Sequence, residues 1–431
     1  MKKKFKSVAL LALLAILCLV LFASCRAGEK VDFFEYGEKD LGVIGRLVKW
    51  MHGWIGNYGW TVVVFTVFLK VIMSPLDFWQ RYSSRKSAVK MQKLQPLLEG
   101  IDKRYGANTQ RANEEKQKLY SKQGYSMASM CLPMIVTWVV FFIMFSGLRS
   151  YATYNSITNF KNLSEVYYEQ CYERIVALDG GESEAAKACK AKYDEATADM
   201  ASKSETEQLI AKFKGWNDGI DAAKAKLDAE AFKTIQQEAI AEVQKAYMAN
   251  HESWLWIQNV WQPDTWEAIM PHFDSGANSF ASQLKMDQFP DDTDGKSLYE
   301  NIIRPAILET GIRGDNGAWN GLMILPIMSV GLSFLSIFIS QLVERKNRKG
   351  EVVAQNQQQA TTNKTMMIIM PLMMAFFGFM YTGAFAIYMV CNYTISTLST
   401  VLLRVPVEKA VEKRLAKEDE KNNTSKAKYM R

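Results

Sequence analysis

Five long apolar stretches alternate with charged segments along this chain of 431 residues. A helix needs about 20 apolar residues to cross a bilayer, and four of the stretches approach that length. The fourth is shorter, and we expect it to extend back to Thr362. The pattern predicts five transmembrane helices, although the mean hydropathy of −0.12 is not that of a membrane protein, because a long polar segment dilutes the apolar ones. The stretches are residues 58–76, 129–148, 322–343, 366–381 and 384–403.

Residues 41–55 carry apolar side chains at helical spacing, which predicts an amphipathic helix. Trp50 and Trp54 are residue types typical of the membrane–water interface. We therefore expect a helix that lies on the membrane surface, with an ordinary core-facing helix as the alternative. Its apolar face consists of Ile44, Leu47, Val48, Met51 and Ile55.

Two polar segments also have a helical composition. Residues 77–125 predict a basic helical hairpin whose arms are separated at Gly106-Ala107-Asn108. Alanine, lysine and glutamate dominate residues 182–250, which predicts further helices, with breaks at Gly215 and Gly219.

The N-terminus has the form of a secretory signal: a basic head, an apolar run from Val8 to Phe22 and the small residues Ala23-Ser24. Ala-Ser-Cys resembles the bacterial lipoprotein box, in which Cys25 is acylated and becomes the mature N-terminus. The alternative is an uncleaved first span in which Cys25 has no special role.

Charge predicts the orientation of the chain, since cytoplasmic loops are rich in Lys and Arg. Residues 77–127 contain 11 basic and 5 acidic residues, whereas residues 150–320 contain 16 basic and 28 acidic residues. We therefore expect the hairpin and the C-terminal tail in the cytoplasm and residues 150–320 outside. Five crossings from an outside Tyr58 are consistent with this arrangement.

These observations predict an all-α fold: a polytopic membrane protein with a five-helix transmembrane core, a cytoplasmic helical hairpin and an extracytoplasmic helical insert. The expected parts are a signal peptide at 1–25, an extracytoplasmic segment with the surface helix at 26–57, the first two spans with hairpin 77–125 at 58–150, the insert at 151–250, an extracytoplasmic connection at 251–320, the last three spans at 321–404 and a basic cytoplasmic tail at 405–431.

Lys70 is the one charge inside the first apolar stretch, about 9 Å from its inner end at about 1.5 Å per residue. Such a charge costs roughly 2.5–3.5 kcal/mol near the middle of a span, so it usually faces a wet cavity or a partner. The alternative is that the side chain snorkels to the inner headgroups. The other apolar stretches contain no acidic residue, which favours a water-filled pocket open to the cytoplasm.

Support for catalysis is weak. The sequence has no GxSxG, HExxH or P-loop motif, so we expect that the protein is not an enzyme. The three histidines lie far apart, and we expect neither a metal nor another cofactor. Cys171 and Cys189 both fall in the predicted outside region, where either a disulfide or a pair of free thiols is possible.

Several short motifs, taken in order, resemble the YidC/Oxa/Alb family of membrane protein insertases. The resemblance covers roughly residues 41–150 and 251–404, with the spans and the basic hairpin in the order of that family. The motifs are Tyr58-Gly-Trp-Thr, Phe68-Leu-Lys-Val-Ile-Met-Ser-Pro75, Lys93-Leu-Gln-Pro96, Cys131-Leu-Pro133, Ile324-Leu-Pro326, Met370-Pro371, Thr382-Gly383-Ala384 and Tyr388-Met-Val-Cys-Asn392.

The resemblance implies a polar groove that is open to the cytoplasm and the lipid and closed on the outside. Lys70 would supply its single positive charge, at a position where many members carry Arg. Thr66 and Tyr388 match positions that contact the entering substrate, and Asn392 belongs to the same lining. Thr137-Trp-Val replaces the Gln-Met-Pro step common in the family, which places Thr137 in the local lining.

The implied function is a membrane protein insertase and chaperone of the bacterial cytoplasmic membrane. Its partners would be nascent membrane proteins, the ribosome, the Sec translocon and anionic lipid, but not DNA, and it would act as a monomer or with Sec. The alternative is a small-solute or anion transporter that uses Lys70 as its binding site. Five spans without an internal repeat, together with a bulky charged hairpin, argue against a transporter.

Overall fold

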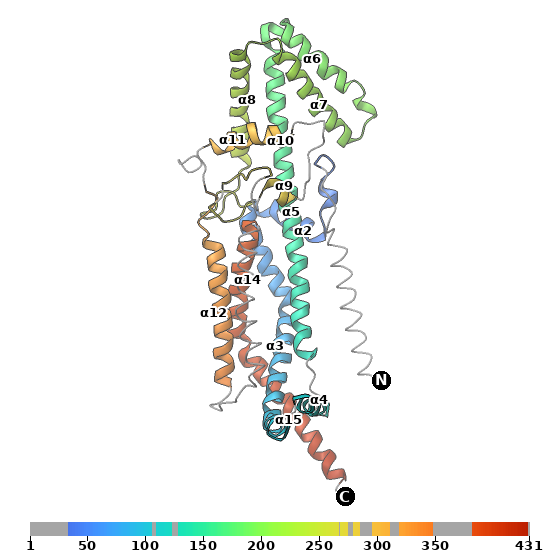
Figure 1. Ribbon diagram of the computed structural model, residues 1–431, viewed down its shortest axis with the longest axis vertical. Helices are drawn as coiled ribbons and strands as arrows, with labels where there is room; N and C mark the ends of the chain where they lie inside the picture. The colour runs from blue at the N-terminus through green and yellow to red at the C-terminus, as the bar shows by residue number, and fades with distance from the viewer. Residues whose placement is uncertain are drawn as a thin grey trace.

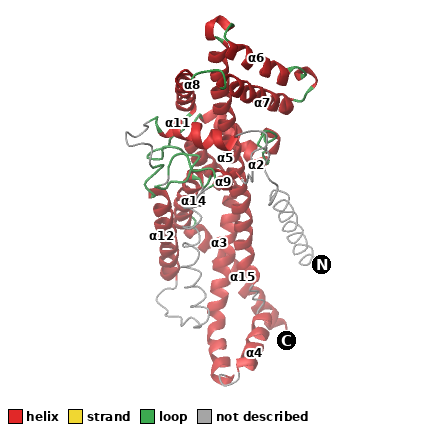
Figure 2. Cartoon of the chain, turned by 45° about the horizontal axis from the view of Figure 1, so that its top comes forward, coloured by secondary structure: helices red, strands yellow, loops and turns green. Residues whose placement is uncertain are grey.

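The computed structural model describes residues 33–105, 109–122, 128–266, 268–274, 279–284, 295–310, 319–347 and 382–429. Helices account for nearly all of the regular structure in these ranges, and they contain no β-strand (Figure 2). The only pairing of extended backbone among them is an isolated bridge between Trp254 and Ile257. The all-α prediction is therefore confirmed for the described part of the chain, whereas Cys25 and the predicted span at 366–381 lie outside it.

Two of the helices are unusually long. In chain order, the elements are η1 (Glu38–Asp40), α2 (Val43–Ile55), α3 (Tyr58–Tyr105), α4 (Thr109–Lys122), α5 (Ala128–Val176), η2 (Leu178–Gly181), α6 (Glu184–Thr197), η3 (Met200–Ser202), α7 (Glu205–Lys224), α8 (Ala229–Asn250), α9 (Phe280–Leu284), α10 (Gly295–Leu298), η4 (Tyr299–Ile303), α11 (Arg304–Leu308), α12 (Ile324–Asn347), α14 (Gly383–Leu402) and α15 (Arg404–Tyr429).

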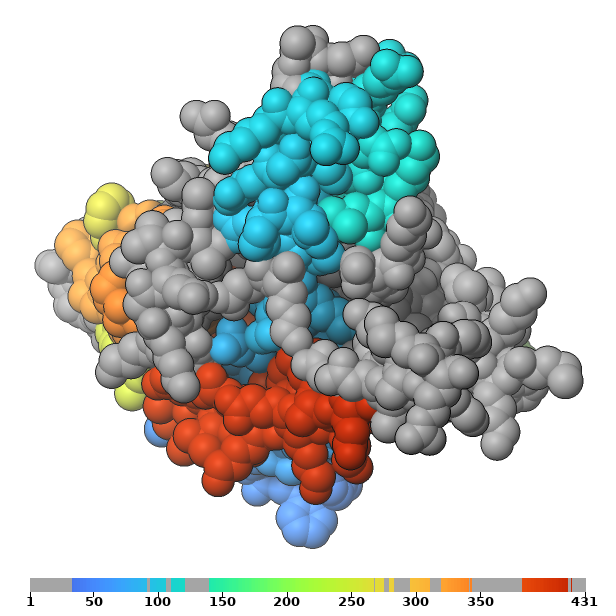
Figure 3. Space-filling view, turned by 90° about the horizontal axis from the view of Figure 1, so that it is seen from below, coloured from blue at the N-terminus to red at the C-terminus, as the bar shows by residue number. Residues whose placement is uncertain are grey.

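The molecule is elongated, and the long helices run along its axis (Figure 1). Helix α14 packs against α3, α12 and α5 in the middle of the molecule. Helices α6, α7 and α8 lie at one end, and α4 and α15 lie at the other. Seen from that second end, the α3–α4 hairpin and α15 occupy different sides of the face, with part of α3 between them (Figure 3).

The long helices merge segments that the sequence analysis separated. Helix α3 contains both the first predicted span and the first arm of the hairpin, with Pro75 and Pro96 inside it. Helix α5 continues from the second predicted span through residue 150, the expected boundary of the insert, as far as Val176. The predicted interruption of the hairpin agrees with α3 ending at Tyr105 and α4 beginning at Thr109.

Two described helices are long and apolar enough to cross a membrane, Tyr58–Lys90 within α3 and Gly383–Leu402, which is α14. A shorter apolar helix, Ile324–Ser340, forms most of α12. The first two agree with the predicted spans at 58–76 and 384–403, and the shorter apolar helix lies within the predicted span at 322–343.

The two larger hydrophobic cores of the described residues lie along the axis. One joins residues 157–175 of α5 to α6, α7, α8 and the loops near α10 and η4, and includes Phe213, Trp216 and Tyr299. We call residues 157–176 of α5 together with α6, α7 and α8 the cap. The other core joins α2, α3, α14 and the first part of α5, and includes Tyr58 and Phe385. We call residues 58–90 of α3, residues 128–150 of α5, α12 and α14 the bundle.

The predicted breaks at Gly215 and Gly219 are wrong, because α7 runs through both glycines. A Cβ atom at Gly219 would lie 2.8 Å from the backbone oxygen of Cys189, and one at Gly215 would lie 3.1 Å from Tyr193. The glycines therefore allow α7 to approach α6 closely. Tertiary packing explains their presence here, although glycine is unfavourable inside an isolated helix.

Candidate functional site

The inner face of α3 carries a row of basic side chains that reach toward α14 and α15. Lys70 is half-buried, and its Nζ donates to Ser396 Oγ at 2.8 Å. Eleven residues later, just over three helical turns, Arg81 donates from Nη1 to Thr400 Oγ1 at 2.7 Å and from Nη2 to the Ser396 carbonyl at 3.2 Å. Three cation-to-oxygen contacts from two basic residues thus link the two helices.

Farther along α3, the row continues at Arg85, whose Nη2 lies 3.5 Å from Glu408 Oε1 on α15. Asp77 lies between Lys70 and Arg81 on the same face of α3 and interacts electrostatically with both. The Nε atom of Arg81 is buried and has no hydrogen-bond partner in the described part of the chain. The site therefore keeps one unused donor close to Lys70.

The opposing face of α14 is a stripe with a repeat of four residues, Tyr388, Asn392, Ser396 and Thr400. Residues four apart lie above one another on a helix. Tyr388 is buried, and its ring centroid lies 6.4 Å from that of Phe141 on α5. Asn392 is half-buried one turn farther along. The stripe runs from an aromatic end to a hydroxyl end, where the basic residues of α3 meet it.

The site residues expected from the sequence do not all lie at the interface between α3 and α14. Lys70 lies at the interface between α3 and α14, as do Asn392 and Tyr388 by their place on the stripe. Thr66 is fully buried, but its hydroxyl donates to the Val62 carbonyl at 2.6 Å, within its own helix. Thr137 lies on α5 in a part whose side chains the structure does not describe.

The sequence analysis missed Arg81, Asp77, Ser396 and Thr400. The signal was present in the spacing, since Asp77 and Arg81 follow Lys70 by 7 and 11 residues, and Ser396 and Thr400 extend the Tyr388–Asn392 repeat by four each time. The sequence analysis found no acidic partner for Lys70 in the other spans, and its partner on α14 is the neutral hydroxyl oxygen of Ser396.

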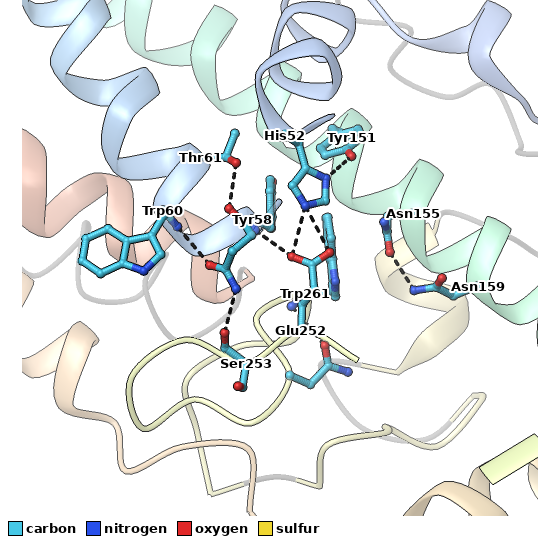
Figure 4. A network of polar contacts seen from close by, with 12 residues as sticks. His52, Tyr58, Trp60, Thr61, Tyr151, Asn155, Asn159, Glu252, Ser253 and Trp261 are labelled. Carbon is cyan, nitrogen blue, oxygen red and sulfur yellow. Dashed lines mark hydrogen bonds and ion pairs between the residues drawn. The ribbon is translucent and has the colours of Figure 1, made fainter. Parts of the chain in front are cut away.

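A second polar cluster holds the outer ends of these helices together (Figure 4). His52 on α2 contacts the Tyr151 hydroxyl at 2.6 Å through Nδ1 and a Glu252 carboxylate oxygen at 3.2 Å through Nε2. The same carboxylate accepts from the Tyr58 backbone N–H at 2.6 Å, at the start of α3. The Tyr58 ring stacks on Trp261, with centroids 4.0 Å apart. Glu252 thus fixes α2 and α3 to the loop after α8.

Helix α2 has the amphipathic form that the sequence predicts. Val48 and Met51 are buried against the neighbouring helices. Trp50 and Trp54 are 60% and 80% exposed, and their rings contact each other. Two exposed tryptophans on one face are consistent with the expected position at a membrane interface.

The disulfide between Cys171 and Cys189 is not formed, because both thiols are free and buried in the cap. Burial raises the pKa of Cys171 to about 12 and that of Cys189 to about 11. Both sulfurs are thus kept protonated by the surrounding apolar side chains, as expected for structural cysteines. In the described part of the chain, no three His, Cys, Asp or Glu side chains gather in a way that could hold a metal ion.

The comparison with known families matches residues 50–178 to the family described as "60Kd inner membrane protein". This match supports the resemblance of residues 50–178 to the YidC/Oxa/Alb family. The matched segment contains α3, α4 and α5 and therefore Lys70, Arg81 and the hairpin. It ends before α6, so the three remaining cap helices lie outside it.

Curated proteins from several bacteria are similar to part of this chain. The protein named "Membrane protein insertase YidC" from Caldanaerobacter subterraneus is 34% identical over 113 residues, which is 26% of this chain and 53% of that protein. The proteins of the same name from Nitratidesulfovibrio vulgaris and Paracoccus denitrificans are 34% and 35% identical over 24% of this chain, but these matches cover only 18% and 15% of their lengths. The chain thus matches about half of the first relative and a smaller share of the others.

Proposed function

We propose that this protein inserts proteins into the bacterial cytoplasmic membrane and helps them fold there. The observation that carries the proposal is the basic row of α3 facing the polar stripe of α14 inside an otherwise apolar bundle. Relatives named as insertases favour this function over the small-solute or anion transporter.

The physical difficulty of insertion is the hydrophilic end of the client, which loses water when it enters the bilayer. We infer that Lys70, Thr66, Thr137, Tyr388 and Asn392 belong to a hydrated groove open to the cytoplasm. Hydroxyl, amide and ammonium groups would replace part of the lost water and attract acidic side chains of the client. The hydrophobic segment would then move sideways into lipid, where its burial drives the reaction.

The Lys70–Ser396 hydrogen bond suggests how the resting groove is held together. An acidic client group that approaches Lys70 would compete with the neutral Ser396 hydroxyl, because a carboxylate carries a full negative charge and accepts more strongly from the ammonium group. Asp77 and Arg81 lie on the same face toward the cytoplasmic end, where the client would enter. In this mechanism no nucleotide or other cofactor takes part.

The cytoplasmic ends support the expected partners. Helices α4 and α15 lie at the end of the molecule that carries the excess of Lys and Arg (Figure 3). We infer that they meet the ribosome, the Sec translocon or anionic lipid headgroups. The lipoprotein-type start at Cys25 and the division of the chain into 58–150, 151–250 and 321–404 remain part of this proposal.

The test is insertion of a small single-span protein with an acidic tail into liposomes that contain only this purified chain, read by protease protection of the tail. We expect protection above that of empty liposomes. Replacing Lys70→Glu should reduce the protected fraction about tenfold, which corresponds to about 1.4 kcal/mol in an equilibrium constant, whereas Lys70→Arg should retain it because the charge is preserved.

The matched control is Lys214→Glu, the same charge reversal at an exposed position of α7. It should leave insertion unchanged. Equal insertion by the Lys70→Glu and Lys70→Arg variants would contradict the electrostatic role of Lys70. Anion flux through the same liposomes in the absence of a client, with no protection of the tail, would support the transporter.

A further inference from the structure

A cavity lies at the base of the cap, where α5 and α8 meet the loop after α8. Its volume is about 120 Å³. Asn159, Phe160 and Leu163 line it from α5, Tyr247 and His251 line it from the end of α8, and Trp261 lines it from the loop. Helix α8 lies toward the end of the molecule opposite to α4 and α15 (Figure 1), and the lining contains neither Lys70 nor its partner Ser396, so the cavity is separate from the Lys70 site.

Two polar atoms of this lining are buried without a partner in the described part of the chain, the Tyr247 hydroxyl and His251 Nε2. Their rings lie 5.4 Å apart. A buried polar atom without a hydrogen bond costs about 1–3 kcal/mol, so such atoms usually have a partner. Two of them at one cavity indicate that the cavity receives a group able to form hydrogen bonds.

The charges of the lining restrict the ligand. None of the described residues that line the cavity is Lys or Arg, so an anion would find no counter-charge. Glu252 is the only carboxylate, and it is engaged by His52 and the Tyr58 N–H. Burial lowers the pKa of His251 and raises that of Tyr247. Both groups are therefore neutral at pH 7, and the site favours an uncharged ligand.

The size of the cavity matches one apolar side chain. A cavity of roughly 150 Å³ in another protein holds a benzene molecule. Phe160, Leu163, Met270 and Phe280 supply apolar walls, whereas Tyr247 and His251 supply a donor and an acceptor. A single aliphatic or aromatic side chain flanked by peptide groups has this combination of properties.

We propose that this cavity binds an uncharged, apolar peptide segment on the outer side of the membrane. The side chain of one residue fills the cavity, and its flanking peptide groups bond Tyr247 Oη and His251 Nε2. The segment comes from the translocated part of a client, and this identification of the partner rests on the proposed function.

The cavity also borders the cluster of Figure 4, since Glu252, Trp261 and Asn159 belong to both. Trp261 stacks on Tyr58, the first residue of α3, and Glu252 binds both α2 and α3. A bound segment would therefore rest on the residues that fix the outer ends of these helices.

The experiment measures binding of acetyl-Ala-Leu-Ala-amide to the full-length protein in nanodiscs by ligand-observed NMR titration. The matched probe acetyl-Ala-Asp-Ala-amide should bind at least about tenfold more weakly, because the site has no counter-charge. Tyr247→Phe should raise the Kd of the leucine peptide about five- to tenfold, since it removes one hydrogen bond to the ligand. Because the native hydroxyl has no partner, this variant should fold normally.

Ser156→Leu, which places an apolar side chain at the cavity wall, should abolish binding. Tyr193→Phe is the control, because it removes a tyrosine hydroxyl from α6, away from the cavity. Equal binding of the two peptides, or equal Kd values for Tyr247→Phe and Tyr193→Phe, would overturn the proposal. A phospholipid that co-purifies with the protein and prevents peptide binding by both the unaltered chain and Tyr193→Phe would also overturn it.

Failure of this proposal and failure of the proposed function are distinguishable. Insertion by the unaltered chain without peptide binding would reject the cavity as a peptide site and leave the insertase in place. Peptide binding by a chain that inserts nothing would reject the client as the partner. Reduced insertion by Ser156→Leu, but not by Tyr193→Phe, would support both the site and its partner.

Discussion

The cap and the bundle are both helical, yet they distribute polar and apolar side chains in opposite ways. In the cap, Phe213 and Trp216 are buried and the charged residues face outward. In the bundle, Val71 and Phe338 are 67% and 57% exposed, while Thr66, Ser329 and Ser333 are buried. The difference is what the proposed function requires, with water around the cap and lipid around the bundle.

The two regions also differ in how the N-termini of their helices are stabilised. Helices α6, α7 and α8 begin at Ser183, Ser204 and Asp228, and each of these side chains accepts a hydrogen bond from a backbone N–H. Helix α14 begins at Thr382 without such a bond from the side chain, and its start lies against the loop residue Gln262, whose carbonyl accepts from the Gly383 N–H. Caps therefore define the water-facing helices, and packing against the loop fixes the start of α14.

The largest expected effect tests the core of the cap. Trp216→Ala should destabilise the cap by about 3–5 kcal/mol, because it removes a buried aromatic side chain and leaves a cavity. Phe338→Ala, at an exposed position of α12, should cost much less because lipid fills the vacated space. Hydrogen exchange of the full-length protein in nanodiscs measures both, and equal losses would contradict the contrast between the two regions.

The next effect tests the surface of the bundle. Val71→Lys should cost roughly 2.5–3.5 kcal/mol for insertion of α3, since it places a charge on a face in contact with hydrocarbon. Met248→Lys is the counterpart on α8, where the native side chain is 50% exposed, and should change stability by no more than about 0.5 kcal/mol. The readout is the membrane-integrated fraction after synthesis with membranes. Similar fractions for the two variants would place the surface of α3 in water.

A smaller effect tests the caps. Ser183→Ala removes the acceptor for the Ala186 N–H, which lies 3.0 Å away, and should cost about 1 kcal/mol. Thr234→Ala removes an exposed hydroxyl of α8 that donates to the Glu230 carbonyl of the same helix. It should leave the stability of α8 nearly unchanged. Comparison of the exchange rates of α6 and α8 amides separates the two, and a larger loss for Thr234→Ala would reject capping as the source of stability.

The smallest effect concerns the cysteines of the cap. With pKa values of about 12 and about 11 in the fold against about 9 when unfolded, Cys171 and Cys189 contribute stability that is complete below about pH 9 and is lost as the pH rises toward 11–12. At pH 8 neither thiol of the folded protein should react with iodoacetamide, whereas both should react in denaturant. Mass spectrometry measures the modification, and rapid labelling at pH 8 would show that the thiols are accessible.

The sequence predicted the helical class, the helix at 43–55 and the two apolar helices of α3 and α14, because hydrophobic periodicity is a local property. It selected Lys70, Tyr388 and Asn392 from their place in these apolar segments. It did not identify Ser396 as the partner of Lys70, since those residues are 326 positions apart and only the packing of α14 on α3 brings them together. Arg81 lies beyond the apolar stretch, and only the packing of α14 on α3 brings it to Ser396 and Thr400.

The sequence alone determined where helices form, which segments are apolar enough for lipid and on which side the charges gather, since each depends on composition over one or two dozen residues. The tertiary structure decided which faces meet. It merged the second span with the cap in α5, used Gly215 and Gly219 for close packing, kept Cys171 and Cys189 as free thiols, and formed the cavity beside Tyr247. These features depend on distances between segments far apart in the chain, which local patterns do not encode.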